Sequence, residues 1–207
     1  MPRKSGIVFV LAGTVLLMSA LSLFLYNRYE DARAGQEAEV LLDEVQMLVE
    51  TVPPAIAEET APWETLSPEL PVVQINGSGY IGYLSIAELE LELPVMSEWS
   101  YSKLKTAPCR QFGSSRTDDL VIAAHNYKKH FGLLSKLEEG ASVLFTDMDG
   151  IENRYEVAAV ETLAPTEVKA VQNSGHDLVL YTCTYGGSTR VTVFCDRPEE
   201  STADSVQ

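Results

Sequence analysis

The sequence predicts a mainly β fold: a closed barrel of about eight strands with short helices, preceded by a membrane-spanning helix and by a stalk that is first helical and then proline-rich. Three observations lead to this prediction. A long uncharged segment lies near the N-terminus, prolines concentrate between residues 51 and 79, and short apolar segments of period two follow from residue 80. Residues 79–197 provide enough chain for a barrel with its own hydrophobic core.

The first element is the apolar segment 7–26, which holds 20 consecutive residues without a charged side chain. A helix of that length crosses a hydrocarbon layer of about 30 Å. Because Arg3 and Lys4 precede it, the positive-inside rule predicts that residues 1–6 are cytoplasmic and that the rest is extracellular, as in a single-pass protein of the cell membrane. The alternative is a signal peptide cleaved near Ala32-Arg33-Ala34, but the apolar segment is longer than the about 7 to 15 residues usual there.

The chain beyond this segment is strongly acidic. The whole sequence has 15 Lys and Arg residues against 30 Asp and Glu, a net charge of −15. Arg3 and Lys4 are the only charged residues before residue 27, so the remainder has 13 basic residues and a net charge of −17. This charge excludes a nucleic-acid partner that needs a basic surface. The hydrophobic content of 45% argues against a disordered acidic chain.

Residues 27–50 are predicted to form a membrane-proximal helix, and residues 51–78 a linker. Along the helix, apolar side chains recur with carboxylates between them, at Val40, Leu41, Val45, Leu48 and Val49. We expect a stalk or packing helix rather than a dedicated partner-binding helix. The linker is inferred from five prolines and two glycines between residues 51 and 79.

The barrel is predicted from short segments rich in β-branched and aromatic residues. These segments are Tyr80–Ile86, Leu89–Val95, Leu120–His125, Ser142–Thr146, Tyr155–Leu163, Leu178–Cys183 and Arg190–Cys195. A short helix is expected at Trp99–Thr106, and Asp149-Gly150 indicates a hairpin turn. Residues 198–207 read as a polar tail.

Candidate chemistry gathers at the ends of three predicted strands. Cys183 ends an apolar strand, so the strand can hold its thiol in place while the thiol meets substrate. Arg190 begins the next strand and would lie opposite Cys183 in a hairpin, where its charge could stabilise a thiolate or an oxyanion. His125 ends a third strand. The spacing alone leaves open that Cys183 is a small buried hydrophobic residue.

The segment LYTCTYGGSTR, residues 180–190, resembles the cysteine signature with downstream arginine of the sortases, membrane-anchored cysteine transpeptidases of Gram-positive bacteria. The segment DLVIAAHN, residues 119–126, resembles their histidine-bearing strand, and FGLLSKLEEG, residues 131–140, resembles the helical turn and glycine that follow it. The resemblance covers residues 79–197 and therefore implies a sortase-like barrel. It is specific because three segments occur in the family's order behind an N-terminal anchor.

The resemblance also implies roles for the candidate residues. Cys183 would attack a peptide bond in the C-terminal sorting signal of an exported protein, commonly an LPxTG-like motif, and form a thioacyl enzyme. His125 would act as the general acid and base, and Arg190 would stabilise the oxyanion or position the substrate. Thr182 would contact the substrate near the acyl group. The acyl group would pass to an amine such as a peptidoglycan precursor or a pilin lysine.

Two alternatives remain at the level of sequence. A cysteine peptidase would hydrolyse the same acyl enzyme, although papain-like peptidases place Cys before His, whereas His125 precedes Cys183. A membrane-tethered surface-assembly or binding protein could retain the barrel without catalysis. Pilus-building sortases often have a second, C-terminal membrane span and a lid with an Asp-Pro-aromatic motif. The polar residues 198–207 and the linker sequence Ala61-Pro62-Trp63 therefore favour wall anchoring or a specialised substrate set over pilus assembly.

The other histidines and cysteines are expected to have structural roles. We expect His130 to lie in a solvated loop with Lys128 and Lys129, and His176 to lie in a turn. The sequence leaves open whether Cys109 and Cys195 form a disulfide.

No metal site and no cofactor are expected, because the cysteines and histidines lack the spacings of zinc ligands. Calcium is a minor alternative at Asp147, Asp149 and Glu152. Their spacing differs from that of an EF-hand loop, and Asp149-Gly150 is already explained as a turn.

Overall fold

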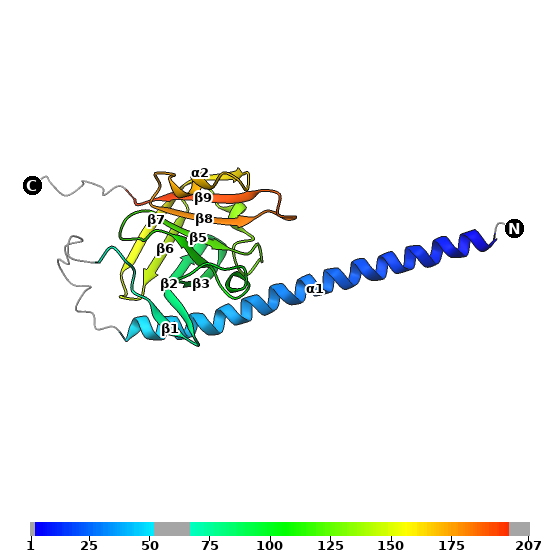
Figure 1. Ribbon diagram of the computed structural model, residues 1–207, viewed down its shortest axis with the longest axis horizontal. Coiled ribbons are helices and arrows are strands. Elements are labelled where there is room, and N and C mark those ends of the chain that lie inside the picture. Colours follow the sequence, from blue (N-terminus) through cyan, green and yellow to red (C-terminus); the bar gives the residue numbers. More distant parts are fainter. Residues whose placement is uncertain (1–2, 52–66, 199–207) are drawn as a thin grey trace, which may run out of the picture. The chain divides into compact units, whose positions relative to one another are not determined.

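The computed structural model describes residues 3–51 and 67–198 (Figure 1). The chain divides into two units, one ending at Arg33 and the other beginning at Ala34. Helix α1, Arg3–Glu50, contributes to both units. The segments 7–26 and 27–50 are thus parts of one helix, which no proline interrupts. Residues 52–66 of the predicted linker and 199–207 of the tail lie outside the described residues.

The N-terminal unit is the apolar part of α1. Its large side chains from Ile7 to Tyr26 are exposed. By length and composition, this helix is apolar enough to cross a membrane, as the sequence predicts.

The part of α1 that belongs to the second unit packs against the barrel through a stripe of small and apolar residues. The buried members are Ala34, Ala38, Leu42 and Val45. Their spacings of four, four and three keep them on one helical face. Val40 and Leu48, predicted for this face, are instead 62% and 37% exposed. The prediction was wrong there because it counted only large apolar residues, whereas the two alanines allow a close approach.

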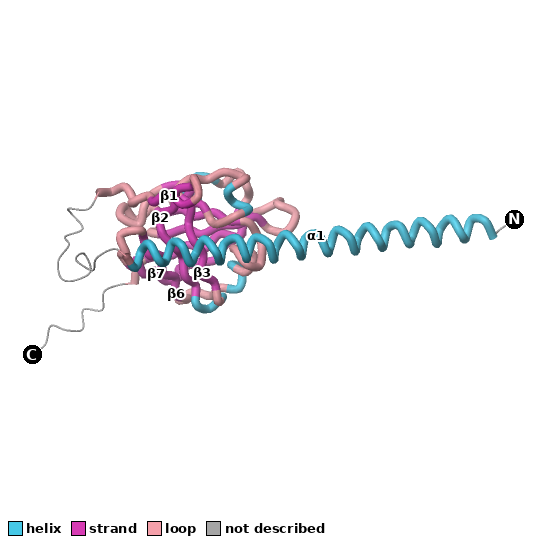
Figure 2. Tube along the Cα trace, turned by 90° about the horizontal axis from the view of Figure 1, so that it is seen from below, coloured by secondary structure: helices cyan, strands magenta, loops and turns pink. Residues whose placement is uncertain are grey.

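The second unit is a closed mixed β-barrel. Its strands are β1 Val73–Ile75, β2 Ser78–Ile86, β3 Leu91–Met96, β4 Cys109–Phe112, β5 Leu120–Ala124, β6 Ser142–Asp147, β7 Glu152–Leu163, β8 Leu178–Cys183 and β9 Arg190–Asp196. The order is β1-β2-β3-β4-β5-β8-β9-β7-β6, and pairing of β2 with β6 closes a barrel of eight strands, with β1 added at the edge of β2. The pairs β3–β4 and β5–β8 are parallel, and the others are antiparallel. The predicted fold class is confirmed, and Figure 2 shows the strands in magenta gathered into this one body.

The structure differs from the predicted elements in three places. Strand β1 and the start of β2 lie within the stretch 51–78 that was predicted to be linker, and Asn76 and Gly77 join them with positive φ angles of 51° and 79°. The only helical element within the predicted helix 99–106 is the 3-10 turn η4, Lys103–Lys105. Strand β4 lies in the stretch 107–118, for which the sequence predicted no strand. Two further 3-10 turns, η3 Ala87–Leu89 and η5 Leu134–Lys136, and one short helix, α2 Val168–Gln172, complete the described elements.

The alternation of side chains separates the filled interior of the barrel from its outer face. On β8, Leu178 and Leu180 belong to the main core cluster, whereas Val179 packs on the outer face with Val121 and Phe194. Because successive residues of a strand point to opposite faces, the odd-numbered residues of β8 point outward. The candidate nucleophile Cys183 is one of these residues.

Candidate active site

Three neighbouring strands bring His125, Cys183 and Arg190 to one end of the barrel. In the parallel pair β5–β8, Ala124 lies opposite Thr182, so the next residues, His125 and Cys183, are neighbours. In the antiparallel pair β8–β9, Cys183 lies opposite Arg190. Adjacent strands are about 4.8 Å apart. The three predicted site residues therefore lie side by side in the order His, Cys, Arg.

These three residues also share the outer face. Ala123, Tyr181 and Phe194 are outward residues of the same strands, and each lies an even number of residues from the corresponding site residue. In contrast, Cys195 is fully buried in the main core, on the inner face. Side chains from three segments of the sequence can therefore act on one substrate that binds to the outside of the barrel.

Thr182 faces the interior. It is only 3% exposed, and its Oγ1 donates a hydrogen bond of 2.8 Å to the carbonyl oxygen of Ala124. This bond joins β5 to β8 directly before His125 and Cys183. The geometry indicates a residue that holds the two strands together, and the substrate contact that the resemblance implied for Thr182 stays a prediction.

A short, well-bonded loop connects Cys183 to Arg190. The backbone N–H of Thr184 donates to the carbonyl oxygen of Thr189 at 3.0 Å, and the two threonine hydroxyl groups are 2.9 Å apart. Gly186 adopts a φ of +88°, in the left-handed region that favours glycine. The loop therefore fixes Arg190 opposite Cys183.

Arg190 bonds to its own loop. Its Nη1 donates to the carbonyl oxygens of Gly187 at 3.1 Å and Thr189 at 3.0 Å. Across the described residues, no carboxylate forms an ion pair with Arg190, so its charge remains available to a developing anion.

His125 is half-buried between the barrel and the segment that carries η4. Burial lowers the pKa of His125 below its ordinary value, and the positive charge of Lys105 lowers it further. Its ring centroid is 5.1 Å from that of Tyr127. The neutral imidazole, which can accept a proton, therefore persists to lower pH than in an exposed histidine.

Sequence analysis missed two polar residues beside Cys183. The hydroxyl group of Tyr181 donates a short hydrogen bond to Oε1 of Gln111 on β4. Burial raises the pKa of Tyr181 to about 12, so the phenol stays protonated at neutral pH. The outward position of Tyr181 could have been found from its spacing of two from Cys183, but its partner 70 residues earlier could not.

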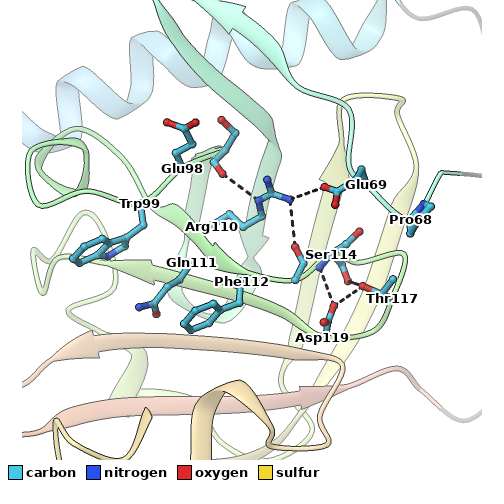
Figure 3. A pocket seen from close by; sticks show the side chains of 12 residues that line it. Pro68, Glu69, Glu98, Trp99, Arg110, Gln111, Phe112, Ser114, Thr117 and Asp119 are labelled. Atoms are coloured by element: carbon cyan, nitrogen blue, oxygen red, sulfur yellow. Dashed lines mark hydrogen bonds and ion pairs between the residues drawn. The ribbon is translucent and has the colours of Figure 1, made fainter. Parts of the chain in front are cut away.

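Gln111 lines a cavity of about 730 Å³ beside β4. Figure 3 shows the side chains of Trp99, Gln111 and Phe112 along this cavity. Arg110 contributes a positive charge and donates to the carbonyl oxygen of Ser97 at 3.1 Å. Glu69 also lines the cavity, and its carboxylate is 3.7 Å from the Arg110 guanidinium.

The prediction for His130 was wrong. The residue is fully buried, although Lys128 and Lys129 beside it are exposed as expected. A tight turn carries it inward, because the backbone N–H groups of His130 and Gly132 both donate to the carbonyl oxygen of Tyr127, at 2.9 and 2.8 Å. His176 lies in the loop between α2 and β8, next to a bend at Gly175, and its Nδ1 is 2.8 Å from Oδ1 of Asp196.

All three cysteines are free thiols. Burial raises the pKa of Cys109 to about 11 and that of Cys195 to about 12. These two cysteines lie in different clusters, Cys195 inside the barrel and Cys109 in the cluster that packs against α1, which explains why they do not form a disulfide. Cys183 is the only cysteine that is partly exposed.

The acidic residues considered for calcium form ion pairs with arginine side chains. Nη2 of Arg116 lies 2.9 Å from Oδ2 of Asp147 and 2.6 Å from Oδ2 of Asp149. Glu152 pairs with Arg154 at 2.6 Å. Within residues 3–51 and 67–198, no group of three or more His, Cys, Asp or Glu side chains is arranged to hold a metal ion.

The family model of the sortase domain matches residues 84–198, more than half of the chain. The chain belongs to the sortase family. Sortases are cysteine transpeptidases that act at the cell surface, so this chain is a sortase transpeptidase in general, as the sequence predicted. A comparison with curated proteins finds no match.

Solved sortase structures share its fold. Sortase C1 of Streptococcus agalactiae is 27% identical, with a TM-score of 0.52 over 60% of this chain and 70% of that chain. Sortase C of Streptococcus pneumoniae is 23% identical, with a TM-score of 0.53 over 83% and 95%. The sortase D5 transpeptidase of Clostridium perfringens is 16% identical, with a TM-score of 0.58 over 79% and 99%.

Proposed function

We propose that this sortase cleaves an LPxTG-like sorting signal of exported proteins with Cys183 as nucleophile, His125 as general acid and base, and Arg190 as the group that stabilises the oxyanion. The observation that carries the proposal is the strand register, which aligns these three residues on one outer face. Cys183 is also the only partly exposed cysteine, whereas the other two are buried thiols with raised pKa values.

The reaction begins when neutral His125 accepts the proton of the Cys183 thiol, and the resulting thiolate attacks the carbonyl carbon of the scissile peptide bond. The carbonyl oxygen becomes an oxyanion, and the Arg190 guanidinium beside Cys183 stabilises it. As the tetrahedral intermediate collapses, the C–N bond breaks and His125 donates a proton to the leaving amine. The products of this half-reaction are a thioacyl enzyme and the released C-terminal fragment.

In the second half-reaction an amine attacks the thioacyl carbon. His125, now neutral, accepts a proton from this amine, the new amide bond forms, and the Cys183 thiolate leaves. We assign Thr182 a positioning role, because its bond to Ala124 holds the His and Cys strands in register.

The partners follow from this chemistry. A sortase C of Clostridium perfringens has been crystallised with a C-terminal cell wall sorting motif, which supports a substrate of the same kind here. The acceptor would be an amine of a peptidoglycan precursor or a pilin lysine. We also propose that α1 anchors the protein in the cell membrane with residues 1–6 in the cytoplasm and the barrel outside, since basic residues precede its apolar part.

The test is acyl transfer by full-length protein in detergent, with fluorogenic LPxTG-type pentapeptides and an added amine. Cys183→Ala, His125→Ala and Arg190→Ala should each lower transfer at least 100-fold. Arg154→Ala and His176→Ala serve as matched controls, because these residues pair with Glu152 and Asp196 away from the three strand ends. Transfer retained by Cys183→Ala would contradict the proposal, and hydrolysis without incorporation of the amine would identify a peptidase instead.

A further inference from the structure

A polar pair, Tyr181 and Gln111, lies between Cys183 and the cavity beside β4. Tyr181 is two residues before Cys183 on the same face, so their Cα atoms are about 6.6 Å apart along the strand. The phenol crosses over β5 to reach Gln111 on β4. Ala123 of β5, opposite Tyr181 in the register, is only 2% exposed, and its small side chain leaves room for the ring.

The pair offers one hydrogen-bond acceptor and one donor beyond its internal bond. The Tyr181 oxygen donates its proton to Gln111 Oε1 and keeps its lone pairs, and the Gln111 amide keeps its N–H groups. If the amide is rotated by 180°, the roles exchange and the pair still offers one donor and one acceptor. A peptide group carries one N–H and one C=O, which is the complementary set.

The protonation state of the pair suits a neutral ligand group. Because the pKa of Tyr181 is raised to about 12, its hydroxyl group remains uncharged at neutral pH. Gln111 does not ionise. The pair therefore has no charge with which to attract an ammonium group or a carboxylate, whereas a backbone amide needs none.

The cavity next to the pair has the character of a side-chain subsite. It measures about 730 Å³, and two aromatic residues, Trp99 and Phe112, line it together with Gln111 (Figure 3). Trp99 in turn contacts Tyr101, with their ring centroids 4.8 Å apart. Apolar walls with a few polar groups are typical of sites that bind a ligand side chain and fix its orientation.

We propose that Tyr181 and Gln111 bind a backbone peptide group of the sorting signal on the acyl side of the scissile bond, with a neighbouring side chain of the signal in the cavity. This inference rests on the proposed function. The distance of about 6.6 Å from Cys183 corresponds to two residues of extended peptide. A contact on the acyl side persists after the first product leaves, so it holds the thioacyl group in position for the incoming amine.

The proposal makes Tyr181 and Gln111 positioning residues whose loss affects binding of the peptide. The probe is the best substrate of the wild-type protein among LPxTG-type fluorogenic pentapeptides. Tyr181→Phe and Gln111→Leu should each raise the KM for this peptide about five- to tenfold, and should leave the KM for the amine unchanged. In the double variant, the KM for the peptide should rise by no more than in the more affected single variant, because the two residues act as one unit. Tyr185→Phe is the matched control, since Tyr185 is 91% exposed.

Ester substitution in the peptide tests the backbone contact itself. Replacing, one at a time, the amide N–H of each of the two residues before the scissile bond by an ester oxygen should weaken wild-type binding about fivefold at one position. The same ester should cause little further loss in Tyr181→Phe. An ester effect of equal size in both proteins, or a change confined to the KM of the amine, would overturn the inference while leaving the proposed function intact.

Two further outcomes separate this inference from the proposed function. If a variant fails to fold, the ester peptides on wild-type protein still decide, because unchanged binding at both positions overturns the backbone contact. A wild-type protein that forms no thioacyl enzyme with any peptide of the panel would overturn the proposed function, and this inference with it.

Discussion

The hydrogen bond from Thr182 to Ala124 should matter for both stability and catalysis. Thr182→Val keeps the branched shape of the side chain and removes the 2.8 Å bond between β8 and β5. A typical intramolecular hydrogen bond contributes about 1 kcal/mol net. We therefore expect the free energy of unfolding to fall by about 1 kcal/mol. Because the bond lies one residue before His125 and Cys183, we also expect kcat/KM for peptide cleavage to fall about tenfold.

Thr192→Val provides the matched control. Thr192 on β9 is also fully buried, but its Oγ1 has no hydrogen-bond partner among the described residues. Burial of this hydroxyl group costs desolvation free energy that no hydrogen bond offsets. The substitution should therefore leave the free energy of unfolding unchanged or raise it by about 1 kcal/mol.

Urea unfolding of full-length protein in detergent, with peptide cleavage assayed on the same preparations, measures both effects. If Thr182→Val loses stability but keeps full kcat/KM, the bond supports the fold without positioning the site. If Thr182→Val and Thr192→Val change stability equally, the value assigned to the bond is wrong.

Two further predictions concern ionisation. His125 should titrate below its ordinary pKa in an NMR titration, and Lys105→Gln should raise that pKa because it removes a positive charge; an unchanged pKa would leave burial as the only cause. Arg116→Met should lower the free energy of unfolding by about 3 kcal/mol near pH 7.5, because it leaves the buried carboxylate of Asp147 unpaired. Burial already raises the pKa of Asp147 in the folded state, so the stability that its protonated form contributes is lost as pH rises. The loss of unfolding free energy in Arg116→Met should therefore be smaller near pH 5 than near pH 7.5. An equal loss at both pH values would contradict this reasoning.

The sequence predicted the barrel and the alignment of the three site residues because both depend on local patterns. Alternating or continuously apolar segments mark most strands, and each site residue lies at the end of such a strand or directly after it. Strand β1 was missed because prolines dominated its neighbourhood, although Asn76-Gly77 is a strong hairpin signal. Strand β4 carries no alternation, and only its pairing with β3 and β5 identifies it.

Other parts of the site depend on tertiary contacts that a single sequence does not reveal. Gln111 on β4 contacts Tyr181 on β8 across the single intervening strand β5. This strand order follows from the barrel topology. His130 is buried because of a turn that folds it back, while the two lysines beside it suggested a solvated loop. In both cases the environment of a polar side chain was set by segments that are distant in the sequence or by backbone geometry.

The inward and outward residues of β8 have different environments. Leu178 and Leu180 point into the core, so their replacement changes folding stability. Val179 and Tyr181 alternate with them and point toward the outer face. Val179 is nevertheless buried against Val121 and Phe194, whereas Tyr181 is partly exposed. Directed evolution of specificity could accordingly sample position 181 while keeping Leu178, Val179 and Leu180 constant.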